Sequence, residues 1–162
     1  MGRSLAKGFM ASTVLIVAFG AAVARTEPAA PAQIMIAHDA GADDPGHFAH
    51  TFFRVDDEMC RGPIWPRTLL TYGLLFANKR GPVPVAADTR LYIQVNSASG
   101  TAQPGRTVTC NNIGSFIPEA GRVYELSQTN SRTGCHFVVV DRATGSLPAS
   151  YIAHPVVAAC RS

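Results

Sequence analysis

The chain has 162 residues, of which 47% are hydrophobic and only 15% charged, whereas globular proteins are usually about one quarter charged. This composition excludes an intrinsically disordered chain, and the length suits a single domain. The formal net charge is +3, and without Arg3 and Lys7 of the amino-terminal segment it falls to about +1, with 12 basic against 11 acidic residues. This charge is too small for electrostatic nucleic-acid binding, and Walker, GxGxxG and GxSxG motifs are absent from the sequence.

Residues 1–24 predict a secretory signal peptide. Arg3 and Lys7 form its basic start, an apolar run follows, and Ala22-Val23-Ala24 is a small-residue cleavage site. The alternative is an uncleaved membrane anchor, but the apolar run of about 17 residues is shorter than the ~20 that a spanning helix needs. We therefore expect a periplasmic or secreted protein with no membrane span after processing. The expected units are a signal peptide at 1–24, a Pro/Ala linker at 25–33 and one β domain at 34–162.

All four cysteines, Cys60, Cys110, Cys135 and Cys160, follow the predicted signal peptide. An even number of cysteines in an exported chain favours two disulfides. Three pairings are possible, of which we favour Cys110–Cys135, joining two strands, and Cys60–Cys160, fixing the tail to the amino-terminal half. A zinc–thiolate site is disfavoured because no CxxC pair is present.

Short strands separated by turn residues recur along the rest of the chain. The alternation is clearest at 90–96, where Leu91, Ile93 and Val95 share one face and polar side chains the wet face. This spacing, without long helical periodicity, predicts an all-β fold: an antiparallel sandwich or open barrel of about seven to eight strands, stapled by disulfides. The expected strands are 33–37, 47–55, 82–85, 90–96, 106–110, 123–128 and a central strand at 135–141, with 67–77 ambiguous between helix and strand. The expected connections are 97–105, 118–121 with Pro118 in its second position, 129–134 and 142–145, and an edge strand or tail begins at Pro148.

Within 110–145 the sequence reads C-x5-F-I-P-E-A-G-x2-Y-E-L and then C-x-F-V-V-V-D-x2-T-G. This pattern resembles small exported bacterial β-proteins of unassigned function, and it covers about a quarter of the chain. The resemblance implies an antiparallel β fold and an exported location, and it supplies no catalytic residue. In residue terms, Gly121 permits a turn and Tyr124 is expected to pack with its hydroxyl near the rim of the domain.

Three of the five histidines and three acidic residues lie within residues 38–50. Imidazole and carboxylate groups are ligands for zinc and copper(II), so His38, Asp43, His47 and His50 are the candidate metal ligands. The competing interpretation, which we favour, is a solvated loop between two strands, so that no cofactor is expected. Under the loop interpretation, substitution of His47 and His50 is expected to leave the stability almost unchanged.

The remaining candidate residues have a structural and a functional interpretation each. Trp65, in a rigid Pro-rich loop, either fills the interior of the sandwich, which we favour, or anchors a partner protein. The acidic triplet at 56–58 is expected to be a solvated patch rather than a glycosidase carboxylate pair. His136 follows a cysteine that we expect in a disulfide, so a thiol–imidazole pair is disfavoured. His154 is expected at the surface.

The sequence therefore predicts no convergent catalytic set. Our leading hypothesis is an exported non-enzymatic β-domain that binds a protein or another envelope component. A periplasmic metal-binding protein that uses residues 38–50 is the first alternative, and a small secreted hydrolase with residues gathered from distant strands is the second.

Overall fold

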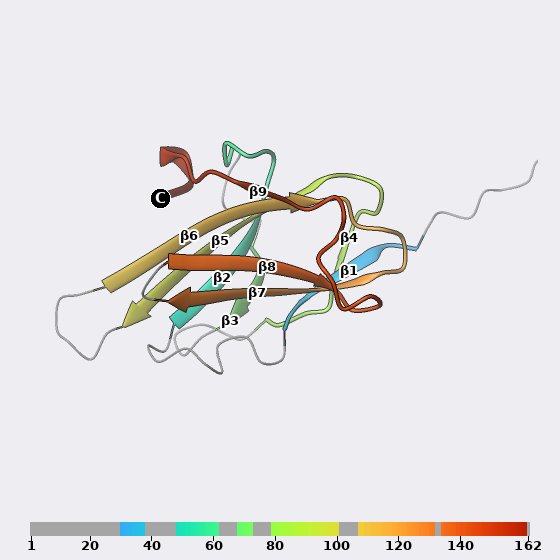
Figure 1. Cartoon of the computed structure of the whole chain (residues 1–162), viewed down its shortest axis with the longest axis horizontal. Coiled ribbons are helices and arrows are strands. Elements are labelled where there is room, and N and C mark those ends of the chain that lie inside the picture. Colours follow the sequence, from blue (N-terminus) through green and yellow to red (C-terminus); the bar gives the residue numbers. More distant parts are fainter. Residues whose placement is uncertain are drawn as a thin grey trace, which may run out of the picture.

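Two β-sheets packed face to face form the domain (Figure 1). The structure is a computed structural model, and it describes residues 30–37, 48–61, 68–72, 79–100, 107–131 and 134–161. These residues contain nine strands and one 3-10 helix. The first sheet has the strand order β4-β1-β7-β8, and the second has the order β3-β2-β5-β6-β9. The elements are β1 Ala32–Ile36, β2 Phe48–Val55, β3 Thr68–Tyr72, β4 Val83–Val85, β5 Leu91–Gly100, β6 Thr107–Phe116, β7 Val123–Ser131, β8 Gly134–Asp141, β9 Ile152–His154 and η1 Ala158–Arg161.

The predicted all-β class is confirmed, and of the two expected architectures the protein adopts the sandwich. Its strand pairs are antiparallel except that β1 runs parallel to β7, with Ile34 opposite Tyr124. After β1 the chain crosses to the other sheet, so no hairpin turn forces β1 to pair antiparallel with a neighbour in sequence.

The core lies between the sheets and is made by alternate residues of each strand, since successive side chains of a strand point to opposite faces. Leu91, Ile93 and Val95 of β5 are buried there, as the sequence pattern predicts. Phe116 of β6, in the same sheet, contacts Tyr124 of β7 in the other sheet, with ring centroids 4.8 Å apart. The buried apolar cluster comprises Ala32, Ile34, Ile36, Phe52, Leu70, Val85, Leu91, Ile93, Val95, Phe116, Tyr124, Leu126, Phe137 and Val139.

Several predicted boundaries are wrong. The segment 97–100, expected in a loop, continues β5, and β6 extends to Phe116. Small and polar residues suggested a loop, but the ten-residue pairing of β5 with β6 keeps both strands extended. β1 begins at Ala32, inside the expected linker. β8, expected to be central because of its β-branched residues, is an edge strand of the first sheet.

Another correction concerns the outer face of the second sheet, where Gln94 was expected to face water. Its side chain is buried, and its Nε2 donates a hydrogen bond of 2.8 Å to the carbonyl oxygen of Cys160. The C-terminal strap, which we define as residues 152–161, covers this face. Together with Val55, Cys60 and Ile113, the strap forms a second small apolar cluster.

Both disulfides have the pairing that we favoured. Cys60–Cys160 fastens the strap, with its Cα atoms 5.4 Å apart. Cys110 of β6 and Cys135 of β8 join the two sheets, with a Cα separation of 6.1 Å. Within the described residues, no helix is long and apolar enough to cross a membrane.

Candidate functional site

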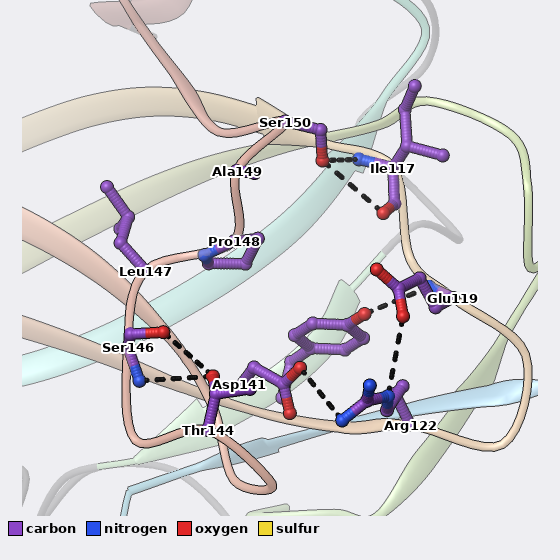
Figure 2. A pocket seen from close by; sticks show the side chains of 11 residues that line it. Ile117, Glu119, Arg122, Asp141, Thr144, Ser146, Leu147, Pro148, Ala149 and Ser150 are labelled. Carbon is purple, nitrogen blue, oxygen red and sulfur yellow. Dashed lines mark hydrogen bonds and ion pairs between the residues drawn. The ribbon is translucent and has the colours of Figure 1, made fainter.

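A pocket of about 460 Å³ opens at one end of the sandwich, where two connections between the sheets meet (Figure 2). One connection joins β6 to β7 and the other joins β8 to β9. Figure 2 shows Ile117 and Glu119 on one side and Leu147 and Pro148 on the other. The lining residues are Ile117, Glu119, Arg122, Tyr124, Asp141, Thr144, Ser146, Leu147, Pro148, Ala149 and Ser150.

The first connection is fixed by backbone hydrogen bonds. The carbonyl oxygen of Pro118 accepts a 2.8 Å hydrogen bond from the amide of Asp88, and a turn closes between Glu119 and Arg122 at 3.2 Å. The turn lies one to two residues later than the sequence predicted, because Gly121 supplies the positive φ of +72° at its third position. This turn places Glu119 and Arg122 on the same rim of the pocket.

The second connection begins at Asp141, whose carboxylate organises the turn that follows β8. Its Oδ1 accepts a 2.9 Å hydrogen bond from the amide of Ala143, and its carbonyl oxygen accepts one of 2.8 Å from Gly145. The two connections are then joined directly, because Ser150 Oγ accepts a 2.9 Å hydrogen bond from the amide of Ile117. Both walls of the pocket are therefore held by hydrogen bonds within the protein.

Tyr124 forms the floor of the pocket. It is 1% exposed, and its hydroxyl oxygen accepts a 2.9 Å hydrogen bond from the amide of Glu119. A tyrosine that begins a strand after a crossing between sheets, and that bonds to the backbone a few residues upstream, resembles the tyrosine corner of other β-sandwiches. Burial raises the pKa of Tyr124, and the charges of Asp141 and Glu119 raise it further, while Arg122 and the Glu119 amide oppose this. The sequence predicted the hydroxyl near the rim of the domain, whereas Tyr124 as a whole is buried and its hydroxyl is hydrogen-bonded within the protein.

Three charged side chains line the pocket. Arg122 lies between two carboxylates, with its Nε 3.4 Å from Glu119 Oε2 and its Nη1 3.5 Å from Asp141 Oδ2. The Asp141 side chain is 10% exposed, whereas that of Glu119 is 67% exposed. The exposed Arg122–Glu119 pair therefore adds little to stability, and the Asp141 carboxylate is the partly desolvated charge of the site.

A second polar cluster lies between the sheets and contains the one candidate metal ligand that the structure describes. His50 of β2 is 2% exposed, with its Nδ1 2.6 Å from the Oγ of Ser97 on β5. Gln128 of β7 donates to the same Ser97 oxygen, and its Oε1 accepts a 3.1 Å hydrogen bond from Asn112 of β6. We call these four residues the polar layer.

His38, Asp43 and His47 lie outside the described residues, so metal binding by this set stays a prediction. The described part of the chain holds no group of three His, Cys, Asp or Glu side chains arranged for a metal ion. The loop interpretation does not hold for His50, because this residue is in a strand and its side chain enters the core. Its substitution is therefore not expected to be neutral.

A third cluster, on the outer face of the second sheet, contains His154. This histidine is half-buried rather than at the surface, because its Nε2 lies 2.8 Å from the Oγ of Ser115. Arg90 donates a 3.0 Å hydrogen bond to the same oxygen. Ser115 is fully buried, so a substrate cannot reach its hydroxyl, and the cluster fixes the strap to the sheet.

The structure describes some of the other residues that the sequence singled out. Trp65 lies outside the described residues. Asp56 and Glu58 of the acidic triplet are exposed, and Asp57 instead closes a turn by accepting hydrogen bonds from the amides of Met59 and Arg61. His136 is exposed, and its neighbour Cys135 is in a disulfide.

The sequence did not identify the charged residues of the pocket. Glu119 and Arg122 lie in and beside a segment that we interpreted only as a turn, and Asp141 is the last residue of a strand. Each is ordinary in its local sequence. The convergence of 117–124 with 141–150 depends on the sandwich topology, which periodicity alone does not give.

Comparison with known proteins adds no family assignment: no protein-family model, no curated protein and no solved structure matches this chain.

Proposed function

We propose that the mature chain is an exported, non-enzymatic binding domain, and that its ligand contacts the pocket between the β6–β7 and β8–β9 connections. The observation that carries this proposal is the pocket itself. It combines apolar side chains at its mouth with three charged groups whose backbones are held by hydrogen bonds. Small-molecule sites are commonly preformed clefts of this size, with a few polar groups in an apolar lining.

The non-enzymatic part of the proposal is supported by the position of the described serine–histidine pairs. Ser97 and Ser115 each lie within hydrogen-bond distance of a histidine, but their exposed fractions are 3% and 0%. A serine nucleophile needs a substrate carbonyl near its Oγ, and neither oxygen is reachable. These pairs therefore suit a structural role.

The exported location is supported by the two disulfides. Disulfides persist mainly in oxidising compartments, and all four cysteines of the chain are paired. We accordingly place the binding event in the periplasm or outside the cell, with a protein or another envelope component as the ligand.

The proposal is tested by following the backbone amide NMR spectrum of the mature protein during titration with a library of neutral, cationic and anionic amphipathic fragments. We expect the affected amides to cluster at 117–122 and 144–150. Ala149→Trp places a large side chain into the pocket lining and should abolish these changes.

The matched control is Ala98→Trp, an equally large change at an exposed position of β5 that does not line the pocket. It should leave fragment binding intact. Chemical-shift changes that persist in the Ala149→Trp variant, or that map to another face of the sandwich, would contradict the proposed site.

A further inference from the structure

The charge of the pocket is unbalanced. Two carboxylates, of Glu119 and Asp141, accompany one guanidinium, of Arg122, and the other eight lining residues are uncharged. The formal charge of the lining is therefore −1. An anionic ligand would have to displace or outcompete two carboxylates to reach the guanidinium, whereas a cation would neutralise the excess charge.

Asp141 keeps the capacity to accept a hydrogen bond from a ligand. Its Oδ1 is occupied by the amide of Ala143, but its Oδ2 faces Arg122 Nη1 at 3.5 Å. Charge-assisted hydrogen bonds between nitrogen and oxygen are normally about 2.7–2.9 Å long, so this contact leaves room for a closer donor. Because the Asp141 side chain is nine-tenths buried, a closer charged donor to its Oδ2 would gain more there than at an exposed carboxylate.

The charges around the Tyr124 hydroxyl also reflect the excess of carboxylates in the pocket. After burial, which raises its pKa most among the causes, the charges of Asp141 and Glu119 raise the pKa and together outweigh the opposing charge of Arg122. The two carboxylates therefore act on the Tyr124 hydroxyl more strongly than the guanidinium does. Figure 2 shows the carboxylates of Glu119 and Asp141 on either side of the Arg122 guanidinium.

The mouth of the pocket adds an apolar contact. Ile117 is 37% and Leu147 is 51% exposed, and both line the pocket, so they present apolar surface to a ligand there. They belong to the two different connections, and Pro148 lies beside Leu147. A ligand that reaches the carboxylates would cover these side chains with its own aliphatic part.

From these observations we propose that the pocket binds a primary ammonium group carried on an aliphatic chain. The ammonium contacts the Asp141 and Glu119 carboxylates beside the Arg122 guanidinium, and the aliphatic chain lies against Ile117 and Leu147. The chemistry fits a free alkylamine or a lysine side chain of a partner polypeptide. This inference rests on the binding function proposed above and names the ligand class of the same site.

The test uses the mature protein and three probes of equal length: hexylamine, hexanol and hexanoate. We expect hexylamine to bind at least about fivefold more tightly than the other two, because the charge pair with the partly buried Asp141 carboxylate adds to the apolar contact that all three share. N-acetyl-lysine amide serves as a fourth probe. Its binding assigns the site to a polypeptide lysine, and binding of hexylamine alone assigns it to a free amine.

Two substitutions remove one charge each with little change of shape. Asp141→Asn should weaken hexylamine binding by about fivefold or more, and Glu119→Gln, at an exposed carboxylate, by about twofold, while both leave hexanol binding unchanged. Asn can still accept the amide hydrogen bond of Ala143, so the turn is preserved. Arg122→Gln removes the competing cation and should strengthen hexylamine binding.

Equal affinities for hexylamine and hexanol would overturn this inference, as would tighter binding of hexanoate that Arg122→Gln abolishes. Either result would leave the binding function standing, because the Ala149→Trp dependence tests that function separately. If Asp141→Asn fails to fold, the exposed Glu119→Gln and the three probes on the unaltered protein still decide the question.

Discussion

Tyr124 and His50 are both buried side chains with polar atoms. Tyr124 reaches the pocket, where its hydroxyl accepts the Glu119 amide. His50 belongs to the polar layer, where its Nδ1 lies 2.6 Å from Ser97 Oγ, and Gln128 donates to the same oxygen. Burying a polar group is unfavourable unless it is hydrogen-bonded, so both residues are expected to be sensitive to substitution.

We predict that Tyr124→Phe lowers the free energy of unfolding by about 1–2 kcal/mol. The ring and its contact with Phe116 are retained, but the amide of Glu119 loses its part-buried acceptor. Chemical denaturation measures the change. Tyr92→Phe, at a half-buried site, is the control and should change stability by no more than about 0.5 kcal/mol. An equal effect of the two substitutions would contradict the role given to the Tyr124 hydroxyl.

The raised pKa of Tyr124 predicts a dependence of stability on high pH. Its folded pKa lies above the ordinary value, so folding favours the neutral phenol. This stabilisation is complete below the unfolded pKa of about 10 and is lost as pH rises through the folded pKa. Unfolding of Tyr124→Phe should therefore depend less on pH above about 10. Tyr151, whose pKa burial also raises, contributes in the same direction, so Tyr151→Phe should reduce the dependence as well.

His50→Ala is predicted to destabilise the protein by about 1–3 kcal/mol, because the buried Ser97 hydroxyl loses its histidine partner in the core. His136→Ala, at an exposed position of β8, is the matched control and should have an effect within about ±0.5 kcal/mol. Thermal unfolding distinguishes the two. Equal, small effects would contradict the stabilising role given to the His50–Ser97 contact.

At the scale of elements, β6 is the strand that connects the parts of the domain. It pairs with β5 and β9 in its own sheet, and Cys110 joins it to β8 in the other sheet. Gly114 allows a close approach, since a Cβ there would lie 3.0 Å from ring atoms of both Phe137 and Tyr151. The two rings also contact each other, with centroids 6.3 Å apart.

We predict that Gly114→Ala lowers stability by about 1–2 kcal/mol, although alanine normally suits a strand better than glycine. The new methyl group has to displace two packed rings. Phe137→Leu should relieve this crowding, so a double-mutant cycle on unfolding free energies should give a favourable coupling between the substitutions. Additive effects would mean that the ring packing does not limit the size of residue 114.

The strap depends on a short strand and one disulfide. β9 pairs with only Ile113, Gly114 and Ser115, so Cys60–Cys160 is expected to provide much of its attachment. Cys60→Ala with Cys160→Ala should lower stability by about 4 kcal/mol, given the 100-residue separation of the two cysteines. Hydrogen exchange should increase at 152–160 in particular. Removal of Cys110 and Cys135 is the control, and its increase should centre on β6 and β8.

Features that neighbouring residues determine could be predicted from the sequence, whereas features that depend on distant segments could not. Alternation placed Leu91, Ile93 and Val95 in the core because side-chain direction in a strand is local. Strand position within the sheet is not local: β8 looked central by composition, but the topology places it at an edge. Gln94 was predicted to be exposed, because the strap that covers it, residues 152–161, is distant from it in the sequence.

The candidate site was beyond sequence analysis for the same reason. Glu119 and Asp141 are 22 positions apart and belong to different connections between the sheets. Only the packing of β7 beside β8, with Tyr124 opposite Asp141, brings these connections to one end of the domain. Local sequence explains each turn, and the three-dimensional arrangement explains the pocket.

At the scale of the whole molecule, two disulfides stabilise different parts of a small sandwich. Cys110–Cys135 joins the sheets, and Cys60–Cys160 holds the strap over the second sheet. Chain-entropy estimates assign about 3–4 kcal/mol or more to each, a large share of a typical stability of about 5–15 kcal/mol. The folded state is therefore expected to depend on the redox conditions in which the chain is made.

Our last prediction concerns the compartment. The chain expressed with residues 1–24 should be recovered from the periplasm or medium with a new amino terminus near Arg25, and thiol labelling after denaturation without reductant should detect no cysteine. The same chain expressed from residue 25 in a reducing cytosol should carry four labelled cysteines and melt at a lower temperature, because neither cross-link restricts its unfolded state. Oxidation of this second sample in vitro should restore the melting temperature. Intact Met1 together with reactive cysteines in the first sample would refute both the export signal and the role of the disulfides.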